Sequence, residues 1–345
     1  PPYQEETAKQ QSETNGQAPR TNVFQYFQIA ADMILPKYSS LIYPGARWIH
    51  RSGKGMQKFG LDQINDKKLQ RIDFYPISQD IFKDVAIADG LTLVLKNNKK
   101  KTNGFTYVYH KGEIKTVVNI DNPGDDLIPL NPQNKSIINK VDYVVKANHL
   151  QYLHSRIMPR SLFGIESNFV ESNPKAVREL ESADSIDYSV EIKLLTNDKA
   201  GKMGRAKWYV ANKNVIPHDN QKYIDQWQVV VSSANAGGQK RDNQVSIVDN
   251  HSAFGRSRVA LGSFATESEA INFYNYVQTY FARFMFLMTD ESLSSLGKRV
   301  PDLMDYSDNN KFIDFSKDLN EQLYIIFKLS SDEINFIETT IKPME

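Results

Sequence analysis

The chain has 345 residues, no cysteine and a formal net charge of +1, with 40% hydrophobic and 24% charged residues. This composition is typical of a soluble globular protein long enough for two domains, and the absence of cysteine excludes disulfides and thiolate metal sites. The sequence contains no run of 18 apolar residues and no recognisable signal peptide, so we expect a cytoplasmic protein without a membrane partner.

The first hundred residues predict alternating helices and strands. Residues 4–22 are polar without an apolar period, which indicates a loop. A helix is expected over residues 22–35, with Asn22 as its cap and Pro36 as its stop. Strands are expected at residues 39–45, 71–75 and 90–96, with a helix at 60–70 and a loop at 76–89. This alternation predicts an α/β sheet with crossover connections.

The pattern changes after a strand expected at residues 105–110. A connection rich in Pro, Gly and Asp at residues 122–133 is the best candidate for a domain boundary. Beyond it, strands are expected in an α+β arrangement at residues 188–195, 207–211, 227–234 and 258–264.

The strongest helix signal covers residues 266–288. Thr266 and Glu269 have the spacing of a capping box. Apolar residues then recur in steps of three and four, and this stripe is more typical of a core than of a base-stacking surface; it comprises Ala270, Tyr274, Val277, Phe281, Phe284 and Met288. A second capped helix is expected from Ser330, ended by Pro343.

Basic residues gather in segments that lack acidic ones. Residues 47–58 hold Arg47, Arg51, Lys54 and Lys58, and residues 199–213 hold Lys199, Lys202, Arg205, Lys207 and Lys213. Shorter clusters lie at Lys240–Arg241, at Arg256 with Arg258, and at Lys298–Arg299. Locally basic loops in a neutral chain fit a polyanionic partner, and a solvated surface is the alternative for any single cluster.

The chain opens with Pro1, Pro2 and Tyr3. Two prolines fix the backbone and remove two N–H donors, which leaves carbonyl groups free to accept. After an Asn or Asp, such a carbonyl could hold the exocyclic amine of a base while the tyrosine ring stacks on its face. This works only for a base turned out of the duplex, and a terminus in polyproline II conformation is the alternative.

Further motifs follow this opening in a fixed order: LIYPGARW at residues 41–48, a basic loop with glycines at 51–60, and residues 71–96. Together they resemble the adenine-N6 DNA methyltransferases of bacterial restriction–modification systems, in the group often fused to a type II restriction endonuclease. Residues 258–286 and 323–344 resemble the C-terminal segment of that family, where target recognition lies. The resemblance covers about residues 1–145 and 250–345.

The resemblance implies a fold and a set of roles. Residues 1–110 would form the later part of a Rossmann-like α/β methyltransferase sheet, and residues 111–345 an α+β target-recognition domain. Pro1, Pro2 and Tyr3 would belong to the catalytic motif, and Phe82 would contact a flipped adenine opposite Tyr3. The motif's Asn and the glycine-rich segment for S-adenosylmethionine would lie in a preceding N-terminal half, so we expect the chain alone to be inactive.

Double-stranded DNA is the partner that the resemblance implies. The basic residues Arg47, Arg51, Lys54 and Lys58 are expected at phosphates near the flipped base, where glycines allow close backbone approach. Residues expected to read bases or set the register on DNA are Lys202, Arg205, Lys207, Gln239, Lys240, Arg241, Asn243, Arg256 and Arg258.

Two other functions stay open. Glu191-x-Lys193 after Asp184 and Asp187 has the spacing of metal-dependent nucleases, although alternating charges on a half-exposed strand explain it equally well. The chain could also be a DNA specificity module without catalysis. Its six histidines are scattered without ligand spacing, so no metal site is expected.

Overall fold

The computed structural model describes residues 4–6, 20–52, 55–87, 89–182, 185–201, 203–234, 245–289 and 293–342. The chain divides into two compact units. Unit 1 comprises Pro1–Lys135 with Met288–Ser295, and unit 2 comprises Ser136–Leu287 with Leu296–Glu345. The expected boundary at residue 110 falls inside a strand of unit 1, and the division lies just after the Pro-rich connection at residues 122–133.

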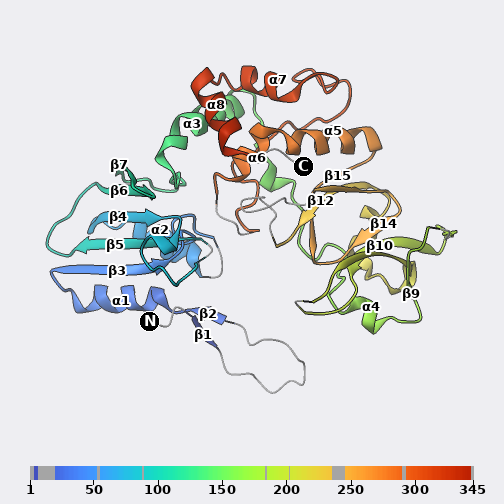
Figure 1. Ribbon diagram of the computed structural model, residues 1–345, viewed down its shortest axis with the longest axis horizontal. Coiled ribbons are helices and arrows are strands. Elements are labelled where there is room, and N and C mark those ends of the chain that lie inside the picture. The colour runs from blue at the N-terminus through green and yellow to red at the C-terminus, as the bar shows by residue number, and fades with distance from the viewer. Residues whose placement is uncertain are drawn as a thin grey trace. The chain divides into compact units, whose positions relative to one another are not determined.

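Unit 1 is built on a five-stranded sheet in the order β3-β5-β4-β6-β7 (Figure 1). The pair β4 and β6 is parallel, whereas the other neighbouring strands are antiparallel. The strands are β3 (Tyr38–Pro44), β4 (Leu69–Tyr75), β5 (Leu91–Asn97), β6 (Gly104–Lys111) and β7 (Ile114–Asp121).

The crossover expected in this sheet is present, but in altered form. The chain passes from β3 through α2 (Met56–Ile64) to β4, and these two strands run in the same direction. They are not neighbours, because β5 returns antiparallel between them. The sheet is therefore mixed, with antiparallel neighbours beside its crossover. Since β3 and β4 share a direction, the loops that follow them leave the sheet at the same edge.

Helix α1 (Phe24–Ile34) lies against this sheet with an unusual orientation. Phe24 and Gln28 are buried, while Met33 is 78% exposed and Ile34 is 76% exposed. The helix begins after Val23 without a side-chain cap, so the expected cap at Asn22 is wrong. After Phe24, the helix turns the polar Gln28 toward the core and leaves Met33 and Ile34 exposed, unlike an ordinary surface helix.

Other elements of unit 1 differ from the expectations in their limits. The polar segment expected to be a loop contains a two-stranded antiparallel ribbon, β1 (Gln4–Glu6) and β2 (Arg20–Asn22). Helix α2 ends before the expected residue 70, because Leu69 already pairs with β5. The core of unit 1 gathers aromatic and aliphatic residues from both layers, among them Tyr43, Trp48, Phe59, Ile72 and Val94.

Unit 2 contains a four-stranded sheet in the order β14-β10-β11-β9 and a three-stranded sheet in the order β13-β12-β15. A short pair, β16 and β8, completes its strands within the described residues. The bounds are β8 (Gln151–Tyr152), β9 (Val177–Glu179), β10 (Glu191–Asn197), β11 (Ala206–Asn212), β12 (Trp227–Ser232), β13 (Ser246–Val248), β14 (Ser252–Phe254), β15 (Arg258–Phe264) and β16 (Pro301–Asp302).

The α-helices beyond α2 are α3 (Lys135–Ala147), α4 (Phe169–Ser172), α5 (Glu267–Gln278), α6 (Tyr280–Phe286), α7 (Leu319–Ile326) and α8 (Ser331–Thr340). Short 3₁₀ turns are η1 (Ser78–Asp80), η2 (Pro132–Asn134), η3 (Leu153–Ser155), η4 (Lys213–Val215) and η5 (His218–Tyr223). None of the helices in the described part of the chain is long and apolar enough to span a bilayer.

The expected capping box at Thr266 with Glu269 is confirmed, and the second capped helix is present as α8, which begins with a capping box of Ser330 and Glu333. The single helix expected over residues 266–288 is instead two helices. The break lies at Thr279, whose extended backbone ends α5 and whose hydroxyl caps the Ala282 N–H at the start of α6. The predicted stripe is buried, except that Tyr274 is half-exposed, so its role in the core is confirmed.

Candidate nucleic-acid interface

Two loops of unit 1 meet at the edge where β3 and β4 end. The backbone N–H of Gly45, directly after β3, donates to the Gly90 carbonyl at 2.8 Å. Arg47 Nε lies 2.6 Å from the carboxylate of Asp89 in the other loop. Trp48 Nε1 donates to the Thr92 hydroxyl at 2.9 Å, at the start of β5. These contacts hold the basic loop against the loop that carries Phe82.

The junction depends on a glycine. Gly90 has a φ of +73°, and a Cβ atom at this position would lie 2.1 Å from the carbonyl oxygen of Tyr75. The chain therefore passes so close to the end of β4 that a side chain is excluded. The glycine lets β5 start directly beside the end of β4.

Ser78 fixes the loop that carries Phe82. Its buried hydroxyl donates to the Val85 carbonyl at 2.7 Å and accepts from the Ile87 N–H at 2.8 Å. The Phe82 N–H donates to the Ser78 carbonyl at 2.9 Å. Phe82 itself is 38% exposed, beside the exposed side chain of Ile81. The loop thus has a defined shape and presents an aromatic ring to solvent.

The basic residues around this loop are not equally available. Arg51 is only 15% exposed, and its guanidinium donates to the Asp125 carbonyl at 2.5 Å. Arg47 is paired with Asp89 but keeps 47% of its side chain exposed. Lys58 is exposed on α2 and makes no ion pair with any described residue. Of the three, Lys58 is the exposed cation without an ion pair to any described residue.

Several expected site residues lie outside the described residues. They are Pro1, Pro2, Tyr3, Lys54, Lys202, Gln239, Lys240, Arg241 and Asn243. The placement of Tyr3 and Phe82 on opposite sides of one base therefore stays a prediction.

In unit 2 the described basic candidates have acidic or backbone partners. Lys207 pairs with Glu179 at 3.0 Å, and this hydrogen bond raises the pKa of the lysine. Arg256 forms an ion pair with Glu166, and the backbone N–H of Arg205 donates to Asp198 at 2.8 Å. Burial lowers the pKa of Arg258. The side chains of Lys207 and Arg256 are thus each held by a carboxylate of the same unit.

One basic residue beside Arg256 escaped the sequence analysis. Arg160 Nε donates to the Arg256 carbonyl at 3.0 Å. Burial and the charge of Arg256 lower the pKa of Arg160. The two cations are 96 positions apart in the sequence, so no local pattern could have grouped them.

The residues of the nuclease alternative are engaged elsewhere. Lys193 pairs with Asp249, and Glu191 faces Arg178 at 3.4 Å. The carboxylate of Asp187 accepts from the Ser189 N–H and hydroxyl, while Asp184 lies outside the described residues. No group of three or more His, Cys, Asp or Glu side chains in the described ranges could hold a metal ion.

A pocket of about 510 Å³ opens beside this ion pair in unit 2. Trp208 and Trp227 line it together with Lys193 and Asp249. The sequence analysis did not identify it, because its lining comes from strands of two sheets. In unit 1, a cavity lined by Asn65 and Asn122 measures about 10 Å³, which is too small for S-adenosylmethionine.

Residues 1–82 match the family model described as Eco57I restriction-modification methylase. The segment carries a methylase signature. The resemblance expected from the sequence is therefore confirmed there, over the stretch from Pro1 to Phe82. Among solved structures, the type IIG restriction endonuclease BpuSI is similar at a TM-score of 0.30 and 9% identity, over 86% of this chain and 42% of that one. This chain thus spans less than half the length of that structure. No curated protein matches the sequence.

Proposed function

We propose that the chain is the part of a site-specific adenine-N6 DNA methyltransferase of a restriction–modification system that holds the target base and contacts DNA. The observation that carries the proposal is the methylase match over residues 1–82, which includes both Pro1–Tyr3 and Phe82. In the intact enzyme, an N-terminal half would bind S-adenosylmethionine, which supplies the methyl group.

The residues of this chain would hold an adenine that has left the duplex. Phe82 offers one exposed ring on a loop of fixed shape, and Tyr3 would offer the second ring. The carbonyl of the Pro1 region would accept an N–H of the exocyclic amine, which orients its lone pair toward the methyl donor. Lys58 lies on the helix that follows the basic loop, where its ammonium can bind a phosphate beside the flipped base.

Unit 2 would read the DNA sequence. Its exposed arginine and lysine side chains suit guanine edges and phosphates, and the residues proposed for this role are Lys202, Arg205, Lys207, Gln239, Lys240, Arg241, Asn243, Arg256 and Arg258. The internal ion pairs of Lys207 and Arg256 favour phosphate contact over base readout for these two residues, because a side chain held by a carboxylate cannot turn freely toward a base edge.

The test compares Phe82→Ala with Ile81→Ala in the full-length gene product. Both changes remove an exposed apolar side chain from the same loop, but only Phe82 would stack on the base. Phe82→Ala should reduce methyl transfer to unmethylated plasmid DNA about 10- to 100-fold, since one stacked base is worth about 1–3 kcal/mol. Ile81→Ala should stay within about twofold, and Phe82→Trp should keep most of the activity.

Tritiated S-adenosylmethionine gives the rate, and nucleoside analysis of the product identifies the methylated base. Equal losses in Phe82→Ala and Ile81→Ala would contradict the stacking role. A product other than N6-methyladenine would overturn the adenine assignment.

A further inference from the structure

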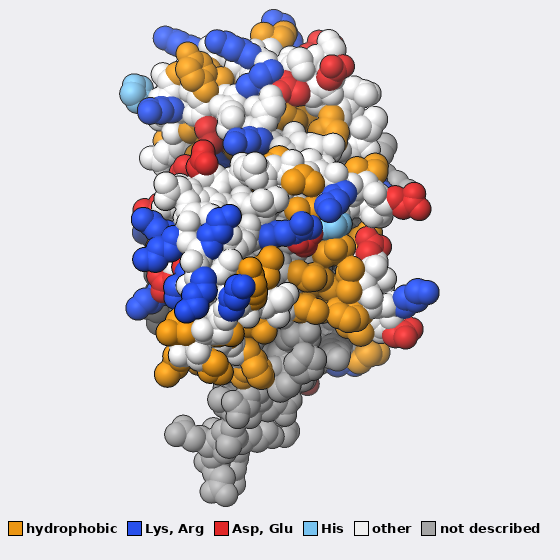
Figure 2. All heavy atoms as spheres, turned by 90° about the vertical axis from the view of Figure 1, so that its left-hand side faces the viewer, with side chains coloured by type: hydrophobic (Ala, Val, Ile, Leu, Met, Phe, Trp, Pro, Cys, Tyr) orange, Lys and Arg blue, Asp and Glu red, His pale blue; other side chains and the backbone are white. Residues whose placement is uncertain are grey.

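A second basic surface lies in unit 1 at the opposite end of the strands, where β3 and β4 begin. Lysines cluster in the turns before β3, before β4 and after β5; we call this set the lysine platform, and it comprises Lys37, Lys67, Lys68, Lys99, Lys100 and Lys101. Strand β4 runs from the platform to the loop of Phe82, so the two lie roughly 20 Å apart along the strand. Figure 2 faces the side of the molecule where these turns lie and shows basic side chains gathered there.

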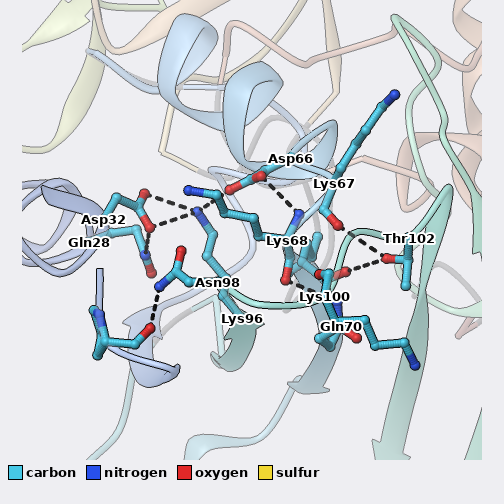
Figure 3. A network of polar contacts seen from close by, with 12 residues as sticks. Gln28, Asp32, Asp66, Lys67, Lys68, Gln70, Lys96, Asn98, Lys100 and Thr102 are labelled. Atoms are coloured by element: carbon cyan, nitrogen blue, oxygen red, sulfur yellow. Dashed lines mark hydrogen bonds and ion pairs between the residues drawn. The ribbon is translucent and has the colours of Figure 1, made fainter. Parts of the chain in front are cut away.

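Backbone hydrogen bonds hold the three turns together. The Asn98 N–H donates to the Lys37 carbonyl at 3.0 Å, and the Thr102 N–H donates to the Lys67 carbonyl at 2.8 Å. The side-chain amide of Gln70 donates to the carbonyls of Lys68 at 3.1 Å and Lys100 at 3.4 Å (Figure 3). The lysines of the platform are thus close in space although they come from distant parts of the sequence.

Two acidic residues beneath the platform share a buried lysine rather than a platform lysine. Lys96 is fully buried, and its ammonium lies 3.0 Å from Asp32 and 2.7 Å from Asp66 (Figure 3). The ammonium groups of the platform, by contrast, have no ion pair with any carboxylate in the described ranges. Five of these six lysines are exposed, and Lys68 is half-buried. The positive charge of the platform is therefore left to the solvent.

We infer that the lysine platform binds the phosphate backbone of a DNA segment outside the site of methylation. The inference rests on the proposed function, which brings DNA to this chain. Lysines bind phosphates as point charges and release counterions without reading bases. The turns are already fixed by hydrogen bonds, so little backbone order is lost on binding. The distance from Phe82 means that flanking DNA or a second segment, rather than the modified base, occupies the platform.

The test neutralises four exposed lysines of the platform through Lys67→Gln, Lys99→Gln, Lys100→Gln and Lys101→Gln. The matched control neutralises four exposed lysines elsewhere in unit 1 through Lys83→Gln, Lys111→Gln, Lys115→Gln and Lys135→Gln. Both variants lose the same charge, so a difference between them reports on position. Lys96 and Lys68 stay unchanged, which preserves the fold, and melting curves of the full chain confirm this.

Binding of the full 345-residue chain to a fluorescent 30-base-pair duplex is measured between 50 and 200 mM NaCl. Each phosphate contact contributes about 0.9 to the slope of log K against log salt, so the platform variant should lose about 2–4 from that slope. The control should lose less than about 1.

The outcomes separate the two proposals. Equal slopes in the platform variant and the control, with binding by the unmodified chain, would overturn the platform alone. No binding by the unmodified chain would overturn the proposed function and the platform with it. Unchanged DNA binding but lost binding to phosphatidylserine vesicles or to an acidic protein would replace DNA as the ligand of the platform.

Discussion

Helix α1 of unit 1 and helices α6 and α7 of unit 2 are packed by different kinds of contact. In unit 1, polar groups lie between α1 and the sheet: the buried Lys96 ammonium meets Asp32 and Asp66, and the Tyr43 hydroxyl donates to Gln28 at 2.5 Å. In unit 2, packed rings join α6 to the end of α7, where Phe281 stacks on Phe327 with ring centroids 4.5 Å apart. The apolar side chains of Met33 and Ile34 on α1 face outward.

The difference shows that similar helices can be held by different forces. A buried ion pair adds little net stability over an apolar contact, but losing one partner leaves a charge without compensation. A core of packed rings responds mainly to changes in volume. The packing of α1 should therefore be sensitive to changes in charge that the stacked rings of α6 and α7 would tolerate.

The largest effect is expected from Lys96→Met, which removes the cation but keeps an unbranched side chain. Asp32 and Asp66 would then lose their shared partner, and unit 1 should lose about 3–5 kcal/mol in its free energy of unfolding. Amide hydrogen exchange in β3 and β5, compared with β10 and β12, measures each unit separately. Lys99→Met, on the exposed platform, is the control and should change the free energy of unfolding of unit 1 by less than about 0.5 kcal/mol. Equal protection in both variants would show that the ion pairs do not hold unit 1.

A smaller effect is expected from Glu333→Gln, which removes the charge from a contact between α3 and α8 in unit 2. Burial raises the pKa of Glu333, but hydrogen bonds from Lys140, from the Ser330 N–H and from Ser136 outweigh it and lower the pKa to about 2. The folded state therefore favours the carboxylate. Its contribution is fully present above the usual pKa of 4.5 and is lost as the pH falls toward 2.

At pH 7, Glu333→Gln should cost about 1–2 kcal/mol after allowance for solvent screening. Urea unfolding at several pH values should show the difference between the two proteins vanishing near pH 2. Asp332→Asn, an exposed change in the same helical turn, should show a much smaller pH-dependent difference. A gap that stays constant with pH would mean that the carboxylate charge is not responsible.

The smallest effect is expected from Thr266→Ala, which removes the hydroxyl that accepts from the Glu269 N–H at 3.3 Å. Loss of an N-cap typically costs about 1 kcal/mol, and Thr266→Ser should recover most of it. Thermal unfolding of the full chain measures both. If serine were no better than alanine, the cap would not be what stabilises α5.

In unit 2, the sequence predicted those features correctly whose signals are local. The capping boxes at Thr266 and Ser330 and the buried stripe of α5 and α6 depend on residues within one or two turns. The break at Thr279 was missed, because the apolar residues continue across it at helical spacing. Its extended backbone depends on tertiary structure and has no local sequence signal. In unit 1, α1 was predicted as a helix but not with its polar face inward, since Asp32 meets a lysine 64 positions away.

In the candidate site, too, contacts between residues distant in the sequence could not be predicted. The resemblance placed Phe82 on a loop after β4, and the structure describes it there. The availability of the basic residues could not be predicted, because Arg51 is held by Asp125 and Arg47 by Asp89 across long sequence distances. The lysine platform likewise depends on three turns that only the folded sheet brings together.

The hydroxyl of Ser78 has a consequence for any ligand of Phe82. By donating to Val85 and accepting from Ile87, it holds the loop in one conformation. Under the proposed function, a base that stacks on the ring would meet a loop that is already ordered, and its apparent affinity would not be reduced by a population of other conformations.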